Sequence, residues 1–91
     1  MFTFEWDDAK AGSNRRKHGV SFDEAITVFG DPNAATFTDT DHWEAEDRSR
    51  TYGISNKGRL LVVVHADRRN NVRIISARKV TKHEETIYQS E

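Results

Sequence analysis

Two long apolar segments in the second half of the chain constrain its fold most strongly. Residues 59–67 read RLLVVVHAD, and a run of apolar residues of this length is typical of a strand buried on both faces. Residues 72–80, VRIISARKV, predict a second buried strand with cations at intervals. Only RRNN, residues 68–71, separates the two, and so short a turn joins antiparallel strands. The centre of an antiparallel sheet is therefore expected here.

Shorter strands are expected around this pair. Residues 2–6, FTFEW, alternate between aromatic and other residues, as a half-buried strand does. Residues 35–40, ATFTDT, form a short threonine-rich candidate. Residues 47–55 also alternate, and SNKG at 55–58 predicts a turn into the next strand. The alternation of residues 47–55 places four side chains on the same side of the strand: Arg48, Arg50, Tyr52 and Ile54.

Three helices are expected from their start and stop signals. Asp7 or Asp8 can cap a helix that runs to about Lys17 or His18, where Gly19 ends it. Capping-box spacing opens the other two helices, with the pairs Ser21 and Glu24, and Thr81 and Glu84. The order β-α-α-β-β-β-β-α predicts one α+β domain over residues 1–91, with the two N-terminal helices and the C-terminal helix packed on one face of an antiparallel sheet.

The charges are segregated although the net charge is only −1. Residues 21–47 hold eight acidic residues and no Lys or Arg, whereas residues 48–83 hold ten cations and a single acid. Such a basic segment can bind a polyanion, and the acidic segment can face a basic partner. Mixed charges also simply keep small domains soluble.

Several classes of function are not expected. The chain has no cysteine, its longest apolar run is far below the roughly 20 residues of a membrane span, and its acidic start is unlike a signal peptide, so a small cytoplasmic protein is expected. There is no P-loop, no G-x-G-x-x-G and no nucleophile elbow. The four histidines show no i, i+4 pair, and HWEAE at residues 42–46 is a poor metal set, so neither metal nor cofactor is expected.

The remaining chemistry suits phosphodiesters. Arg and Lys can hold a phosphate and neutralise the charge of its transition state, while His, Glu or Tyr can move a proton. RNA carries its own nucleophile, the 2′-hydroxyl. Each candidate also has a structural alternative: helix capping for His18, a salt bridge from Arg78 to Glu84 or Glu85, and core packing for Tyr88 and His65.

Taken together, the segments resemble the BrnT toxin family. The similarity covers nearly the whole chain, in order, through FEWDDAKAGSNRRKHGVSFDEAITVFGDP, EDRSRTYGIS, LLVVVH and RIISARKVTKHEETIY; KHGVSFDEA and RIISAR are its most specific pieces. The resemblance implies a RelE-like fold and a ribonuclease toxin of a type II toxin–antitoxin system. It also implies a hetero-oligomer with a ribbon-helix-helix antitoxin like BrnA, which neutralises the toxin and contacts operator DNA.

The resemblance also supplies candidate site residues. The motif matches give as catalytic candidates Lys17, His18, Arg48, Arg78, Glu84 and Tyr88. In this interpretation Arg48 and Arg78 bind the scissile phosphate, and His18 or Glu84 accepts the proton of the 2′-hydroxyl. Lys17 helps to hold RNA, and Tyr88 stacks or donates a proton. Further RNA-binding candidates are Arg15, Arg16, Arg50 and Arg73.

Two functions remain open at this stage. The first is a metal-independent endoribonuclease toxin. The second is a non-catalytic module that binds RNA or protein and represses its operon together with an antitoxin. A joint RNA site further requires residues 14–18 to fold near the basic strands.

Overall fold

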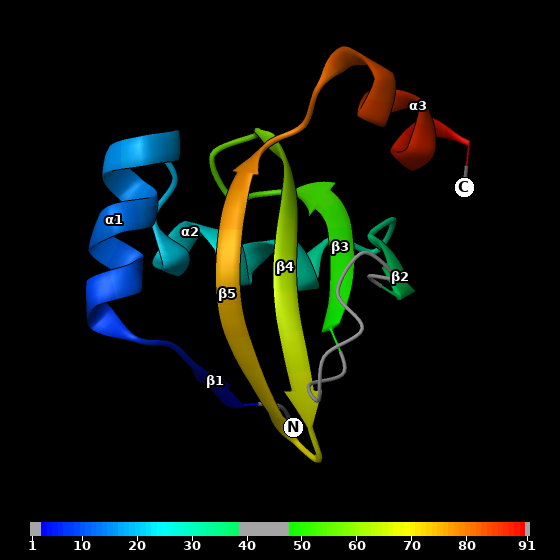
Figure 1. Cartoon of the computed structure of the whole chain (residues 1–91). Helices are drawn as coiled ribbons and strands as arrows, with labels where there is room; N and C mark the ends of the chain where they lie inside the picture. Colours follow the sequence, from blue (N-terminus) through cyan, green and yellow to red (C-terminus); the bar gives the residue numbers. More distant parts are fainter. Residues whose placement is uncertain (1–2, 39–47, 91) are drawn as a thin grey trace.

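The computed structural model describes residues 3–38 and 48–90 of the chain. HWEAE and Asp47 therefore lie outside the described residues. A five-stranded sheet, in the order β1-β5-β4-β3-β2, forms the centre of the molecule (Figure 1). The elements are β1 (Thr3–Glu5), α1 (Asp8–His18), α2 (Phe22–Ile26), the 3-10 helix η1 (Thr27–Gly30), β2 (Ala35–Thr38), β3 (Arg48–Ile54), β4 (Leu60–Arg68), β5 (Asn71–Lys79) and α3 (Lys82–Gln89).

The two long apolar segments form the predicted hairpin at the centre of this sheet. β4 pairs antiparallel with both β5 and β3, which confirms that it is the central strand. The turn between β4 and β5 places Arg69 at φ 55°, a left-handed conformation that a tight hairpin requires. In the turn between β3 and β4, Gly58 has φ 74°, where glycine carries no steric penalty.

The prediction of a purely antiparallel sheet is wrong at one edge. β1 pairs parallel with β5, with Phe4 opposite Val72, so the sheet is mixed. The hairpin rule orients only strands that a short turn connects. β1 and β5 are at opposite ends of the chain, so no turn determines their relative direction.

The predicted limits of α1 are confirmed. The Asp7 carboxylate accepts hydrogen bonds from the backbone N–H groups of Ala9 and Lys10, at 2.8 and 3.2 Å. Gly19, with φ 71°, ends the helix in the left-handed conformation. The helix runs beside the edge of β5, beyond the point where β1 stops (Figure 1).

Asn14 attaches α1 to that strand edge. Its side-chain amide donates to the carbonyl oxygens of Ala77 (2.8 Å) and Val20 (3.0 Å) and accepts from the N–H of Ala77 (3.2 Å). Asn14 is the buried residue of α1, and its side chain takes the place of a neighbouring strand. A polar residue therefore holds this helix where apolar packing is sparse.

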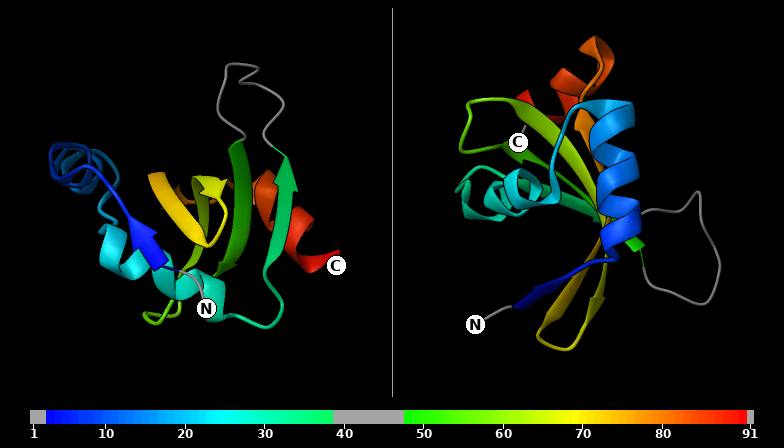
Figure 2. Two further views of the ribbon diagram at one scale, coloured as in Figure 1. Left: turned by 90° about the horizontal axis from the view of Figure 1, so that it is seen from below. Right: turned by 90° about the vertical axis from the view of Figure 1, so that its left-hand side faces the viewer.

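α2 and η1 cover one face of the sheet, which we call the core face. The Ser21 hydroxyl caps α2 by accepting from the N–H of Glu24 at 3.0 Å. Phe22, Ala25 and Val28 are buried against strand residues, and Figure 2 shows these helices lying along one side of the strands. The core cluster contains Val20, Phe22, Ala25, Val28, Leu61, Val63, Val72, Ile74 and Ala77.

Glu24 ties α2 to the turn between β3 and β4. It is 3% exposed and forms a salt bridge with Arg59, whose Nε lies 2.9 Å from Oε2 of Glu24. Ser55 donates to the same carboxylate oxygen at 2.6 Å. The hydrogen bond from Arg59 is the main cause of the lowered pKa of Glu24, which stays ionised in a buried position.

The prediction that all three helices share one face is wrong for α3. The Thr81–Glu84 capping box is confirmed, because each side chain bonds the other residue's backbone N–H. The helix then turns over the opposite face, where Glu84 pairs with Arg78 and Ile87 shares a hollow with Tyr52. None of the described helices is long and apolar enough to cross a membrane.

Candidate functional site

Arginines of several strands gather on the sheet face opposite the core face. Alternate residues of a strand point to the same side, so the pairing register defines three rows across β3, β4 and β5. These rows are Tyr52–Val62–Arg78, Arg50–Val64–Ser76 and Arg48–Ala66–Arg73. We call this surface the arginine face; it is defined by Arg48, Arg50, Arg73 and Arg78.

A bulge in β5 brings Arg73 and Arg78 onto the same face. Ser76 pairs with Val64 but Ile74 pairs with His65, so Ile75 has no partner in the register. Strict alternation would send residues five positions apart to opposite faces. The extra residue therefore converts an odd spacing into a shared surface, which sequence periodicity did not predict.

The arginines differ in how they are held. Arg78 donates two parallel hydrogen bonds to Glu84, at 2.8 and 3.0 Å. Within residues 3–38 and 48–90, by contrast, no salt bridge is formed by Arg48 or Arg73. Glu5 of β1 lies opposite Arg73 in the register. Arg48 and Arg73 are thus the cations of this face with the most freedom to meet a ligand.

Glu84 is a poor proton acceptor in this arrangement. The Arg78 hydrogen bonds, helped by the backbone N–H of Thr81, lower the pKa of Glu84 from 4.5 to about 2. A general base works best when its pKa lies near the working pH. The geometry therefore favours the structural alternative, in which Glu84 orients the Arg78 guanidinium.

Lys17 and His18 lie at the edge of the arginine face. Together with Lys10, Ser13 and Asn14 of α1, they line a hollow of about 200 Å³ against Ile75 and Ser76 of β5. Ser76 belongs to the same row as Arg50, about 10 Å away across two strand spacings. The structure thus brings the end of α1 next to the basic strands, as a joint site requires.

Arg15 and Arg16 are exposed on α1 and are not brought into this hollow. Arg15 instead lines a separate depression with Trp6, Phe22 and Asp23.

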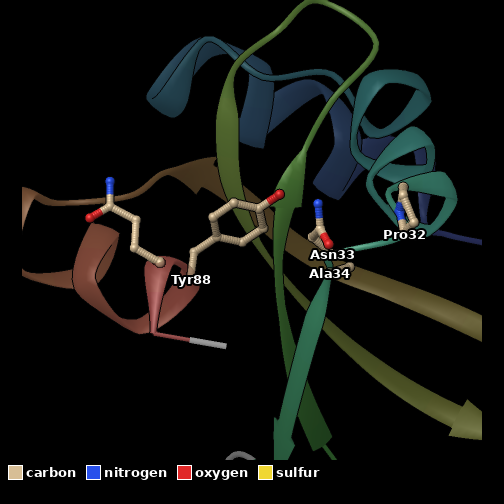
Figure 3. A pocket seen from close by; sticks show the side chains of 5 residues that line it. Pro32, Asn33, Ala34 and Tyr88 are labelled. Atoms are coloured by element: carbon tan, nitrogen blue, oxygen red, sulfur yellow. The ribbon is translucent and has the colours of Figure 1, made fainter.

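Tyr88 lies away from the α1 residues. Its hydroxyl donates to Oδ2 of Asp31 at 2.7 Å, and Asp31 also accepts from the N–H of Ile54 at 2.7 Å. The hydrogen bond to Asp31 raises the pKa of Tyr88, which makes it a weaker acid. Figure 3 shows Tyr88 pointing from α3 toward Asn33, within a hollow of about 510 Å³ at the start of β2. α3 therefore crosses one end of the arginine face, with Glu84 at β5 and Tyr88 near β2.

His65 is a satisfied core histidine. It is 2% exposed, lies edge-on to Phe29, and forms ring-nitrogen hydrogen bonds with Thr51 (2.8 Å) and Asp67 (2.6 Å). It faces the core side, so it does not join the arginines. Across the described part of the chain, no group of three or more His, Asp or Glu side chains is placed to hold a metal ion.

Sequence reasoning missed one aromatic residue of the arginine face, Phe37, whereas the alternation of residues 47–55 places Tyr52 with Arg48 and Arg50. Phe37 of β2 lies opposite Arg50, and Tyr52 lies opposite Ala35. The alternation of ATFTDT was the available signal, but it did not reveal which face Phe37 occupies. Asn14 was also missed, because nothing local predicts that a polar side chain will bond a distant strand.

An α+β domain with cations gathered on one open sheet face can bind a polyanion. The family comparison identifies the class more closely: residues 6–84 match the model of the ribonuclease toxin BrnT of type II toxin–antitoxin systems. The chain belongs to the BrnT family, and a toxin of this class has an antitoxin partner. No functionally curated protein matches the chain by sequence.

A solved structure has the same fold. The crystal structure of the Brucella abortus ribonuclease toxin BrnT superposes with a TM-score of 0.68 at 21% sequence identity. The match covers 90% of the present chain and 100% of the Brucella chain. At this identity the likeness concerns the fold, which both chains share over almost their whole length.

Proposed function

We propose that this chain is an endoribonuclease that cleaves RNA through attack by its own 2′-hydroxyl. The observation that carries the proposal is the position of Lys17 and His18 beside the arginine face. Family membership supports the same reaction class.

The proposed roles follow from chemistry and position. His18 takes the proton of the 2′-hydroxyl, since imidazole exchanges protons near neutral pH. The 2′-oxygen then bonds to phosphorus, the bond to the 5′-oxygen breaks, and the leaving oxygen takes its proton from water. The products are a 2′,3′-cyclic phosphate and a 5′-hydroxyl end. Lys17 and Arg48 stabilise the extra negative charge on the scissile phosphate.

Glu84 and Tyr88 have supporting roles in this proposal. Glu84 holds Arg78 toward the face, and Tyr88 fastens α3 to Asp31. Arg48 and Arg78 are separated by two strands and four positions, about 16 Å between their backbones. They therefore hold neighbouring parts of one RNA strand rather than one phosphate. No step needs a metal, because RNA supplies the nucleophile and side chains supply the positive charge.

The test uses protein purified away from its antitoxin and mixed with RNA in the presence of EDTA. We expect wild type to cut, and His18→Ala and Arg48→Ala each to lower the rate by about 100-fold or more. Lys57→Ala, an exposed cation in the β3–β4 turn, is the control and should cut normally. Intact RNA with wild type, together with equal harmlessness of wild type and Arg78→Ala on expression, would contradict the proposal.

A second candidate function is RNA or protein binding without cleavage, with the chain acting as co-repressor. The bonds that occupy Glu84 and Tyr88 favour it, since they remove two potential proton carriers. Wild type that binds RNA but never cuts it, and that arrests growth no more than His18→Ala, would establish this function instead.

The proposed partner is a ribbon-helix-helix antitoxin like BrnA, through which operator DNA is bound, and the proposed location is the cytoplasm. Co-expression with the neighbouring small open reading frame should restore growth and yield a hetero-oligomer by size-exclusion chromatography. Operator DNA should shift with the complex and not with the toxin alone.

A further inference from the structure

A small hollow on the arginine face has an aromatic wall. Phe37, Arg50, Tyr52 and Ile87 line it, and its volume is about 280 Å³. Phe37 is 40% exposed, whereas Tyr52 beneath it is 2% exposed. The two rings meet edge to face, with centroids 6.0 Å apart and an interplanar angle of 72°. Phe37 is therefore an oriented aromatic surface in contact with solvent.

The surroundings of Phe37 are cationic. Arg50 lies directly opposite Phe37 across the β2–β3 pair. Arg48 is two residues before Arg50 and lies on the same face of β3. Cross-strand neighbours of this kind have Cβ atoms about 5 Å apart. A ligand that covers the Phe37 ring thus meets guanidinium groups at its margin.

This combination of features matches one ligand chemistry. An exposed ring next to cations suits a planar base joined to a phosphate, because the base stacks on the ring while the phosphate meets the charge. A hollow of this size is smaller than the usual pockets for drug-sized molecules. The charge complementarity favours a nucleotide over an apolar protein segment.

We propose that Phe37 and its hollow form a stacking subsite for one unpaired nucleotide, so that this toxin takes single-stranded RNA. The proposal rests on the proposed function, in which the arginine face binds RNA. In a duplex the bases are stacked on one another, so none can reach Phe37 without unpairing. The subsite thus selects the substrate by strandedness, whereas the arginines attract any nucleic acid.

The experiment measures fluorescence anisotropy with 2′-O-methyl RNA, which lacks the 2′-hydroxyl nucleophile. Single-stranded and duplex probes of the same sequence are titrated at several salt concentrations. Phe37→Ala should weaken single-strand binding by about 5- to 150-fold, the range of one stacked base. The affinity lost through Phe37→Ala should be similar at every salt concentration. Arg73→Ala should instead lower the slope of log affinity against log salt concentration by about one.

Substitutions that separate stacking from apolar contact sharpen the test. Phe37→Trp should retain single-strand affinity, and Phe37→Leu should lose nearly as much as Phe37→Ala. Ile54→Ala is the matched control, since Ile54 is 37% exposed on the neighbouring strand and does not line the hollow. Circular dichroism of each variant verifies that the edge-strand change leaves the fold intact.

The outcomes separate the two proposals. Wild type that cuts RNA while Phe37→Ala binds and cuts equally well would overturn the subsite and leave the nuclease intact. Equal wild-type affinity for single strand and duplex, or full affinity of Phe37→Leu, would also overturn it. Wild type that neither binds nor cuts RNA would overturn the proposed function, and the subsite with it. If Phe37→Ala lost antitoxin binding while RNA binding stayed unchanged, the hollow would be a binding site for a protein and not for a nucleotide.

Discussion

The two faces of this sheet are built from the same strands but have opposite characters. On β4, Leu61 and Val63 point into the core, and their neighbours Val62 and Val64 point to the arginine face. The core face is sealed by α2 and η1, whereas α3 covers only one end of the other face. Burial of the first face stabilises the fold, so that the second face can hold several arginines side by side.

Each face also has its own arginine–glutamate pair. On the core side, the Glu24 side chain is 2% exposed, and its salt bridge with Arg59 fixes a loop to a helix. On the arginine face, Glu84 is 14% exposed where it meets Arg78, which fixes a guanidinium beside the open surface. The same chemistry therefore holds the fold together in one place and orients a candidate ligand contact in the other.

The largest expected effect on stability comes from a substitution in the core face. Leu61→Ala should lower the free energy of unfolding by about 2–5 kcal/mol, because Leu61 is fully buried and leaves a cavity. Val63→Ala and Val64→Ala give the matched comparison, since the same atoms are removed from opposite faces. Urea unfolding should show the larger loss for Val63, and equal losses would contradict the division into a sealed face and an open face.

The next effect concerns the Arg78–Glu84 pair and pH. Because the pKa of Glu84 falls from 4.5 to about 2 on folding, its stabilisation is present above pH 4.5 and is lost as the pH falls toward 2. The full contribution is below about 3 kcal/mol, since the 37% exposed Arg78 side chain is screened by water.

Glu84→Gln tests this by removing the titration. The gap in unfolding free energy between wild type and this variant, measured in urea, should be widest near pH 7 and should close as the pH falls from 4.5 toward 2. A gap that stays constant with pH would show that the pair does not stabilise the fold.

A smaller effect on stability is expected from the buried hydrogen bond between Thr51 and His65 in the core face. Thr51→Val removes the hydroxyl that meets Nε2 of His65, and an unpaired buried nitrogen costs about 1–3 kcal/mol. Thr38→Val, on the exposed strand β2, is the control and should change stability by less than about 0.5 kcal/mol. Equal losses in thermal unfolding would mean that the Thr51 contact contributes nothing specific.

The smallest effect on the fold is expected on the arginine face itself. Arg73→Ala should leave the unfolding free energy within about 0.5 kcal/mol of wild type, because Arg73 is a half-buried surface cation. RNA cleavage should nevertheless slow, as one phosphate contact is lost. A loss of stability without a loss of cleavage would assign Arg73 to the fold instead of the site.

Local signals predicted the elements well. Both Ser21 and Thr81 cap helices as expected, Gly19 ends α1, and the turns at residues 55–58 and 68–71 are where the sequence places them. These features depend on residues within about four positions, where spacing alone determines the geometry. The Arg78–Glu84 salt bridge, weighed as the structural alternative, is also observed.

The family match predicted which cations to consider but not how they are grouped. Lys17 and His18 share a hollow with Ser76 at the edge of the arginine face, whereas Tyr88 is bonded to Asp31 near β2. The roles of these residues in cleavage stay predictions. The RelE-like relationship and the antitoxin's identity stay predictions as well.

The sequence by itself determined the two hairpins of β3–β4 and β4–β5, the helix caps, and the alternation of apolar and basic residues along the strands. Each of these depends on near neighbours in the chain. Only the tertiary structure decided that β1 runs parallel to β5, that Asn14 seals the β5 edge and that α3 lies across the arginine face. It also decided, through the bulge at Ile75, that Arg73 and Arg78 share a surface. These features join residues far apart in the chain, and their energies come from pairing and packing partners that no local pattern specifies.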